Sequence, residues 1–521
     1  MKRLLWLSTL AFSVALAACN SGGGSSITVP PPTGGFTLGS LNGTYAFSMS
    51  GMDPSTGAYF VRTGSFVADG AGNISSGLED AVDLGSAVNE VTLSGKYTVL
   101  ANGRGTIVLT DSSGDTLDWT MDLQSSSQGL LVETDGNFAS SGSFNLQNVN
   151  DFLLTSIAGN YVFDFSGINL GPSGAAVTNI SIIGDIAANG GSITGGVIDT
   201  NDFNNGPSGA TILTPGSYQL DPTYGTTYGR GTATFAGRTF AFYIVDATHL
   251  KFIEEDATGT EGASGDALVQ TGAIPATTAA FTGNFVYLVG GASTLGADAS
   301  VARFTVSGPG TIGSISYDEN NAGTPAHISQ GSNISNATCA IDAANAGSGR
   351  GTFTFTDSTG GTFSYVFYLY SPNSGVIQDV STNIVADGTL LGQSGSPFTL
   401  AGLAGNYVYN WNGVNNSSLN EEDFIGQFTL ASGSSNNISG VLDGTVVGAS
   451  AGNLYPNIGT QGTLTINSTD STTNNTLTIV AGSPLSATYN SVAYVVDAST
   501  VLVLDTDKSS VLAGVVTRQS Q

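Results

Sequence analysis

Apolar and polar residues alternate in short runs along most of the chain, which is the pattern of β-strands with one buried face. Between residues 38 and 150 this alternation predicts eight short strands and no helix. The gaps are rich in Gly, Asn, Asp and Ser, as at 69–73 and 101–103, which is typical of tight turns between antiparallel neighbours. The expected strands cover residues 44–50, 59–68, 74–82, 91–100, 105–110, 117–123, 130–135 and 141–148.

A motif with a glycine and two alternating aromatic or apolar residues opens this pattern four times. Its glycines are Gly43, Gly159, Gly283 and Gly405, at intervals of 116, 124 and 122 residues. Regular intervals of this kind indicate four copies of one folding unit. Since alternate residues of a strand share a face, we expect the aromatic positions in the core. The copies read Gly43-Thr44-Tyr45-Ala46-Phe47, Gly159-Asn160-Tyr161-Val162-Phe163, Gly283-Asn284-Phe285-Val286-Tyr287 and Gly405-Asn406-Tyr407-Val408-Tyr409.

Eight antiparallel strands with short connections can close into a barrel, which removes exposed strand edges. We therefore expect an all-β chain of four tandem antiparallel meander modules, each an eight-stranded up-and-down, lipocalin-like barrel, arranged like beads on a string. The same pattern permits tandem β-sandwiches. The expected organisation is a lipoprotein signal peptide at 1–19, a flexible tether at 20–37 and β-modules at 38–150, 151–272, 273–395 and 396–521.

The N-terminus has the features of a bacterial export signal. Lys2 and Arg3 precede an apolar run at 4–16, which is too short for a permanent membrane span. The sequence Leu16-Ala17-Ala18-Cys19 resembles the lipobox of bacterial lipoproteins. That resemblance implies cleavage before Cys19 and attachment of lipid to it, so that the chain is held at a membrane. Asn20 follows Cys19, which favours the outer membrane and leaves the leaflet open.

The charge balance narrows the range of partners. Removal of the signal peptide leaves 10 basic and 39 acidic residues, a net charge of −29. Nucleic acid and anionic lipid headgroups are poor partners for such a surface. We expect no nucleic acid and no cofactor, and we expect contact with the membrane only through the N-terminal lipid.

Three sets of charged residues recur in the modules. An arginine stands within Gly-Arg-Gly-Thr, an aspartate follows an isoleucine by six residues, and a further aspartate comes late in the module. We favour structural ion pairs in which an arginine fork on a carboxylate fastens one end of a module. The alternative is that the same groups line a barrel mouth and hold an anionic or polar ligand. The residues are Arg104, Arg230 and Arg350, then Asp80, Asp199 and Asp318, then Asp135, Asp256 and Asp379.

Residues suited to catalysis are scarce. Histidine occurs only at His249 and His327, and neither stands in a zinc-ligand spacing or near a nucleophile elbow. With Cys19 assigned to lipid, Cys339 has no partner, and its alignment with Tyr97 and Tyr218 predicts a buried thiol. We expect no enzyme activity and no metal site.

The body of the chain resembles uncharacterised multi-repeat lipoproteins of Gram-negative bacteria. The resemblance covers residues 41–517 and rests on the elements Gly-x-Tyr-x-Phe, Asp-Gly-x-Gly-Asn and Gly-Arg-Gly-Thr. It implies no activity. We expect a non-enzymatic, membrane-tethered cell-envelope protein that displays four modules for adhesion or surface binding to a glycan or protein. The alternative is a set of lipocalin-like carriers of small apolar or amphiphilic ligands.

Overall fold

The computed structural model describes residues 27–31, 33–54, 58–83, 86–169, 178–256, 261–329, 334–416, 420–433, 435–447 and 452–520. These residues form four closed, eight-stranded antiparallel barrels in tandem, as the alternation predicted, and not β-sandwiches. We number the barrels 1 to 4 in chain order. Among the described residues, no helix has the length and apolar character needed to cross a membrane.

Barrel 1 is a plain meander in which each strand pairs with the next and the last strand pairs with the first. Alternation places Tyr45, Phe47 and Met49 inside it. The strands are longer than the apolar runs, because pairing extends into the polar residues at both ends. They are β1 (Asn42–Asp53), β2 (Ala58–Asp69), β3 (Asn73–Asp83), β4 (Ser86–Val99), β5 (Arg104–Asp111), β6 (Thr116–Leu123), β7 (Gln128–Glu133) and β8 (Ala139–Leu146).

Barrel 2 repeats this meander and adds one short strand, β12, beside its third strand. Pairing between β10 and β11 and between β17 and β9 closes it. Its strands are β9 (Ala158–Asn169), β10 (Thr178–Asn189), β11 (Ser192–Asp202), β12 (Thr211–Ile212), β13 (Gly216–Leu220), β14 (Arg230–Phe235), β15 (Arg238–Asp246), β16 (His249–Glu254) and β17 (Glu261–Val269).

Barrel 3 likewise carries an additional strand, β21, paired with its third strand. Its strands are β18 (Gly283–Ser293), β19 (Gly296–Gly308), β20 (Thr311–Asn321), β21 (Thr324–Ser329), β22 (Ile334–Ile341), β23 (Arg350–Asp357), β24 (Thr362–Ser371), β25 (Ser374–Asp379) and β26 (Ile384–Gly392).

Barrel 4 returns to the plain meander of barrel 1. Its strands are β27 (Gly405–Asn415), β28 (Asn420–Leu430), β29 (Asn437–Val447), β30 (Gly452–Thr465), β31 (Asn475–Ala481), β32 (Thr488–Val495), β33 (Thr500–Asp505) and β34 (Ser510–Arg518).

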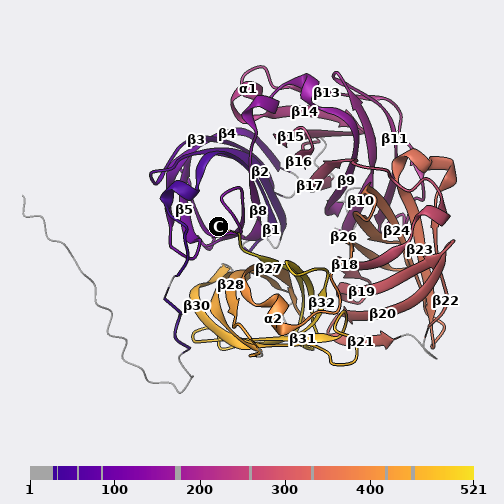
Figure 1. Ribbon diagram of the computed structural model, residues 1–521. Helices are drawn as coiled ribbons and strands as arrows, with labels where there is room; N and C mark the ends of the chain where they lie inside the picture. Colours follow the sequence, from indigo (N-terminus) through magenta and orange to yellow (C-terminus); the bar gives the residue numbers. More distant parts are fainter. Residues whose placement is uncertain are drawn as a thin grey trace, which may run out of the picture.

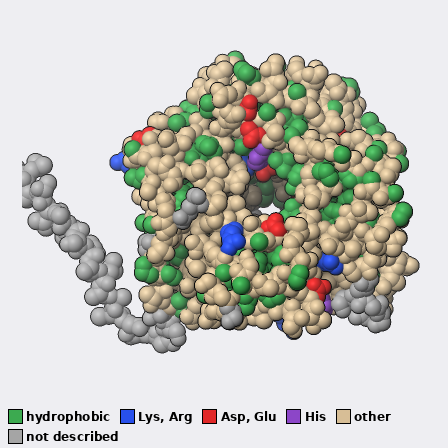
Figure 2. Space-filling view, in the orientation of Figure 1, with side chains coloured by type: hydrophobic (Ala, Val, Ile, Leu, Met, Phe, Trp, Pro, Cys, Tyr) green, Lys and Arg blue, Asp and Glu red, His purple; other side chains and the backbone are tan. Residues whose placement is uncertain are grey.

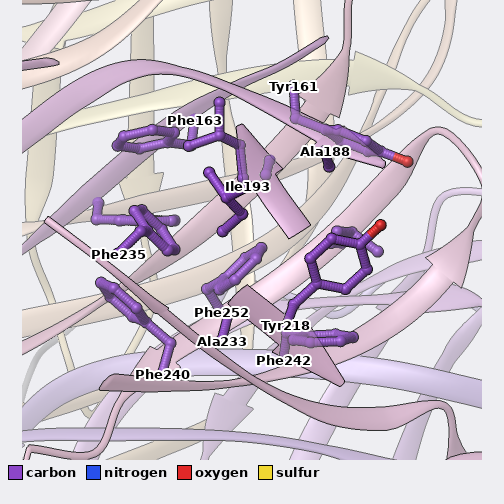
Figure 3. Packing of buried hydrophobic residues seen from close by; sticks show 14 of the residues in the cluster. Tyr161, Phe163, Ala188, Ile193, Tyr218, Ala233, Phe235, Phe240, Phe242 and Phe252 are labelled. Atoms are coloured by element: carbon purple, nitrogen blue, oxygen red, sulfur yellow. The ribbon is translucent and has the colours of Figure 1, made fainter. Parts of the chain in front are cut away.

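Aromatic side chains fill the barrel interiors. In barrel 2, Phe165 lies 5.2 Å from Phe240 and 5.3 Å from Phe252, measured between ring centroids. Figure 3 shows this core, with Phe163 and Phe235 directed toward the same space. The other three barrels hold comparable clusters of buried rings and aliphatic side chains. The aromatic faces predicted from the repeated motif are therefore core.

Short helices lie beside the strands. A helix precedes the first strand of each barrel, and the Tyr97 hydroxyl donates to the carbonyls of Leu38 and Leu41 in this segment of barrel 1. Cys339 occupies the corresponding place in barrel 3, where it is 3% exposed, so its predicted burial is confirmed. Burial raises the pKa of this thiol to about 11. The helices are η1 (Leu38–Ser40), η2 (Val149–Asp151), η3 (Leu154–Ser156), α1 (Gly225–Tyr228), η4 (Thr278–Ala280), η5 (Ala343–Ser348) and α2 (Leu400–Leu403).

The four barrels form a closed ring, and the fourth lies against the first (Figure 1). Apolar clusters join the barrels along part of this ring, for example Tyr228 and Tyr243 with Leu78, and Tyr494 with Val301. Each barrel therefore has two neighbours. The linear string expected from the sequence is wrong, because a string leaves the first and last modules apart.

Candidate functional site

The arginine of Gly-Arg-Gly-Thr binds a carboxylate of the preceding barrel. Arg230 of barrel 2 donates from Nε and Nη2 to Asp80 of barrel 1, at 2.8 and 3.0 Å. The Tyr243 hydroxyl donates to the same carboxylate at 2.7 Å. Both Arg230 and Asp80 are buried, so the fork is held in a fixed geometry.

The same arrangement recurs twice around the ring. Arg350 of barrel 3 binds Asp199 of barrel 2 at 2.7 and 2.8 Å, again with a tyrosine hydroxyl, that of Tyr368, on the carboxylate. Arg104 of barrel 1 binds Asp443 of barrel 4 at 2.6 and 2.5 Å. The last pair joins the two ends of the ring.

The interface between barrels 3 and 4 uses different groups. Tyr494 donates to Asp318 at 2.5 Å, and His327 Nδ1 lies 2.8 Å from the same carboxylate. Asn474, in the copy that lacks the arginine, lies 3.3 Å from His327 Nε2. His327 thus stands beside Asp318 where the other interfaces have arginine.

These contacts change the interpretation of the repeated ion pairs. The hydrogen bonds to Asp199 raise the pKa of Arg350, although burial opposes this. Because each arginine fork is occupied by a carboxylate of another barrel, it fastens two barrels together rather than one end of a single module. The geometry gives no support to an anionic ligand on these forks.

The late aspartates are not among the carboxylates that Arg104, Arg230 and Arg350 bind. Each accepts a hydrogen bond of 2.7 Å from a backbone amide: Asp135 from Asn137, Asp256 from Thr239 and Asp379 from Ser381. Their place is thus in turns and strand ends. Cys19, the predicted site of lipid attachment, lies outside the described residues.

A repeated glutamine, absent from the sequence predictions, also joins the barrels. Gln270 Nε2 donates to the carbonyls of Ser348 and Leu369 in barrel 3, both at 2.9 Å. Each barrel has such a glutamine just after its last strand, and each reaches two carbonyls of the next barrel. The set is Gln147, Gln270, Gln393 and Gln519, with Gln519 of barrel 4 reaching Asn102 and Leu123 of barrel 1.

A glycine stands five residues before each of these glutamines and forms part of a central cavity. A Cβ atom at Gly265 would lie 1.8 Å from the Asp164 carbonyl oxygen, so a side chain at this position has no room. The other three glycines are equally close to a carbonyl of the first strand of their barrel. The set is Gly142, Gly265, Gly388 and Gly514. The Gly-x4-Gln spacing could have been found in the sequence. The spacing alone does not reveal that the glycine lines the cavity and that the glutamine joins two barrels.

The cavity lies at the centre of the ring and has a volume of about 780 Å³. All four barrels contribute to its wall, mainly through the first and last strands of barrels 2, 3 and 4 and the last two strands of barrel 1. Figure 2 shows the molecule hollowed at this point, with acidic, basic and histidine side chains near the hollow. The cavity is therefore the concave site that the ring creates and that a single barrel lacks.

Two facing aspartates of barrel 2 line this cavity. Asp164 on β9 pairs directly with Asp266 on β17. Lys251, which is buried, lies 3.1 Å from Asp266, and His249 lies 3.3 Å from it. Although burial acts in the other direction, these two groups lower the pKa of Asp266. Burial, and then the charges of Asp387 and Asp266, raise the pKa of Asp164 well above its ordinary value.

Among the described residues, no three His, Cys, Asp and Glu side chains are placed to hold a metal ion. His249 is engaged with Asp266, and His327 with Asp318. The arrangement is suited to binding through charge and shape.

No protein-family model matches the chain, and no curated protein sequence matches it. Among solved structures, the chain is similar to isotype 1 transferrin binding protein B from serogroup B Neisseria meningitidis, at 7% identity over 81% of this chain and 84% of that one, with a TM-score of 0.19. It is also similar to intact Ap-TbpB with its N and C lobes, at 9% identity over 96% and 82%, with a TM-score of 0.13. Likeness this low establishes no shared function.

Proposed function

We propose that the chain is a non-enzymatic binding protein of the cell envelope whose ring of four barrels takes one ligand in its central cavity. The observation that carries the proposal is the cavity of about 780 Å³ with a wall drawn from every barrel. Cavities of this size are typical of small-molecule sites. The ring geometry favours a single shared site over four separate ones.

Binding inside individual barrels is less well supported. Trp119 in barrel 1 and Trp411 in barrel 4 are each 1% exposed and belong to dense interior clusters. A space inside barrel 4, lined by Tyr407 and Phe428, has a volume of only about 10 Å³. An interior filled in this way leaves no room for a carried ligand.

The location belongs to the same proposal. Lipid on Cys19 would hold the protein at a membrane, with outer-membrane placement favoured by Asn20. The segment 20–37, rich in Gly and Pro, would separate the ring from that membrane. A small ligand, or an extended part of a surface glycan or protein, would then reach the cavity from the envelope space.

A glycine of the cavity wall provides the test. A Cβ atom at Gly290 would meet open space, so Gly290→Trp fills the cavity without a backbone clash. Gly308 also faces open space but does not line the cavity, and Gly308→Trp is the matched control. Native mass spectrometry of the lipid-free mature chain, purified from its own host, measures retained ligand.

We expect one bound small molecule per chain in the natural protein and in Gly290→Trp no bound molecule, with Gly308→Trp unchanged. Absence of any bound molecule from the natural protein, or full retention of it by Gly290→Trp, would contradict a central binding site.

A further inference from the structure

The charged side chains in the described lining of the central cavity are all acidic. Five carboxylic acids line it, from barrels 2, 3 and 4, and its described lining includes no Lys, Arg or His side chain. Lys251 and His249 approach one of the five, Asp266, at 3.1 and 3.3 Å, and Lys251 also lies 3.4 Å from the Ser143 hydroxyl of the lining. The five are Asp164, Asp266, Asp298, Asp387 and Glu421.

Two of these carboxyl groups each have one oxygen without a hydrogen-bond partner in the described part of the chain. Oδ1 of Asp164 and Oδ1 of Asp298 are buried and accept no hydrogen bond from the described residues. Asp298 is only 2% exposed, and burial, followed by the charge of Glu319, raises its pKa to about 8. Withdrawing a carboxylate from water without a partner is costly. Groups left in this state are suited to an incoming positive charge.

Carboxyl groups of different barrels also affect the ionisation of their neighbours. Besides burial, the charge of Asp387 of barrel 3 raises the pKa of Asp164 of barrel 2. Burial raises the pKa of Tyr59 of barrel 1, and an interaction with Ser264 lowers it. The charges of Glu421 of barrel 4 and of Asp387 raise this pKa further. Acidic groups from three barrels therefore share the lining of one cavity, and the Tyr59 hydroxyl donates at 3.4 Å to the carbonyl of Ser166, which also lines it.

Apolar side chains and bare backbone make up much of the rest of the wall, together with polar side chains such as Ser166, Asn410 and Asn412. Val162, Leu268, Leu288, Val408 and Val515 line it, one or two from each of barrels 2, 3 and 4. The four glycines of the last strands add backbone surface. Such walls favour a ligand with an aliphatic body over a fully hydrated ion.

We infer that the central cavity binds an organic cation with an aliphatic body, such as an alkyl diamine, whose ammonium groups contact Asp164, Asp387 and Glu421. This inference rests on the proposed function, because it names the ligand class of the same cavity. Charge pairing in this cavity supplies specificity, and burial of the alkyl chain supplies further affinity.

Titration calorimetry of the lipid-free mature chain with three probes of matched length tests this inference. The probes are diaminooctane, octanediol and suberate, which carry positive, neutral and negative ends. Asp164→Asn and Asp387→Asn remove charge at constant shape, and Asp115→Asn is the control, since Asp115 is exposed on barrel 1.

We expect binding of diaminooctane alone, weakened at least about tenfold by either cavity variant and unaffected by Asp115→Asn. The cavity variants should melt no lower than the natural protein, so loss of binding will not reflect unfolding. Equal binding of octanediol, or unchanged diamine affinity in both variants, would overturn the inference.

Two further outcomes separate this inference from the proposed function. If Ca²⁺ alone binds and the same variants abolish its binding, the carboxyl groups serve a metal ion and the inference fails. If diaminooctane does not bind while Gly290→Trp still removes a host-derived molecule, the cavity is a binding site for another ligand class, and only the inference on the cation is overturned.

Discussion

Arg104 in barrel 1 binds Asp443 in barrel 4 across 339 residues of chain, with Nε and Nη2 at 2.6 and 2.5 Å from the two carboxylate oxygens. This pair closes the ring at what we call the closing interface, between barrels 4 and 1. Nearby, Ser141 donates to Asp423 at 2.7 Å, and Thr445 donates to the Glu133 carbonyl at 2.5 Å. The contacts that close the ring are thus strongly polar.

Arg104→Met should weaken the closing interface. Asp443 is fully buried and would lose its charged partner, at a cost of about 3 to 5 kcal/mol in the free energy of unfolding. Denaturant unfolding of the mature chain measures the change. Lys96→Met removes an exposed charge of the same barrel and should change stability by less than about 0.5 kcal/mol. Equal stability of the two variants would contradict a structural role for the pair.

The closing interface should also respond to pH through Asp122. Opposite each repeated arginine the neighbouring strand carries Tyr243 or Tyr368, but opposite Arg104 it carries Asp122. Burial, and then the charge of Asp443, raise the pKa of Asp122 well above its ordinary value, while the charge of Arg104 acts in the opposite direction.

Asp122 therefore keeps its proton in the folded ring, whereas in the unfolded chain it releases that proton above about pH 4. As a result, the contribution of Asp122 to the free energy of unfolding falls as pH rises above about 4. Asp122→Asn should remove its share of that slope, measured by melting at a series of pH values. Other buried carboxyl groups also lower the stability as pH rises. The difference in this pH dependence between Asp122→Asn and the natural protein gives the contribution of Asp122 alone. Identical slopes would count against this assignment.

His327 should report on the interface between barrels 3 and 4. Its hydrogen bond to Asp318 raises its pKa, with burial opposing the shift. The stabilisation is complete below the unfolded pKa of about 6.5 and is lost as pH rises through the higher folded value. The side chain is 41% exposed, so we expect less than about 1 kcal/mol. An NMR titration should show this pKa falling in Asp318→Asn, and an unchanged pKa would rule out the contact.

Gln270→Ala should destabilise the interface between barrels 2 and 3. The substitution leaves the Ser348 and Leu369 carbonyls without their side-chain donor, at about 1 to 3 kcal/mol in unfolding free energy. Gln128→Ala, at an exposed strand position, is the control. Chemical denaturation should separate the two variants, and matching midpoints would show that the repeated glutamine does not support the ring.

The strands and their closure into barrels could be predicted because they depend on local alternation and turn residues. Alternation placed Tyr45 and Phe47 in the core, and the alignment with Tyr97 placed Cys339 there too. The burial of each of these residues is decided within one module, so one copy of the repeat contains the needed information.

The ring could not be predicted in this way. Three of the four copies contain both an arginine and an aspartate, so the repeat cannot distinguish Arg230 bound to its own module from Arg230 bound to Asp80 of the previous one. The cavity carboxyl groups are not part of the repeated pattern, since the positions of Asp164 and Asp387 hold unrelated residues in the other copies. Their proximity depends on the closure of the ring, which no local pattern records.

Small-angle X-ray scattering of the lipid-free mature chain tests the closed ring most directly, because the central cavity exists only if barrels 1 and 4 meet. A compact chain of this length has a radius of gyration of about 23 Å. We predict a value slightly above this and a scattering curve that fits the ring. A curve that fits four barrels in an extended row, with a much larger maximum dimension, would contradict the closed ring and the binding site at its centre.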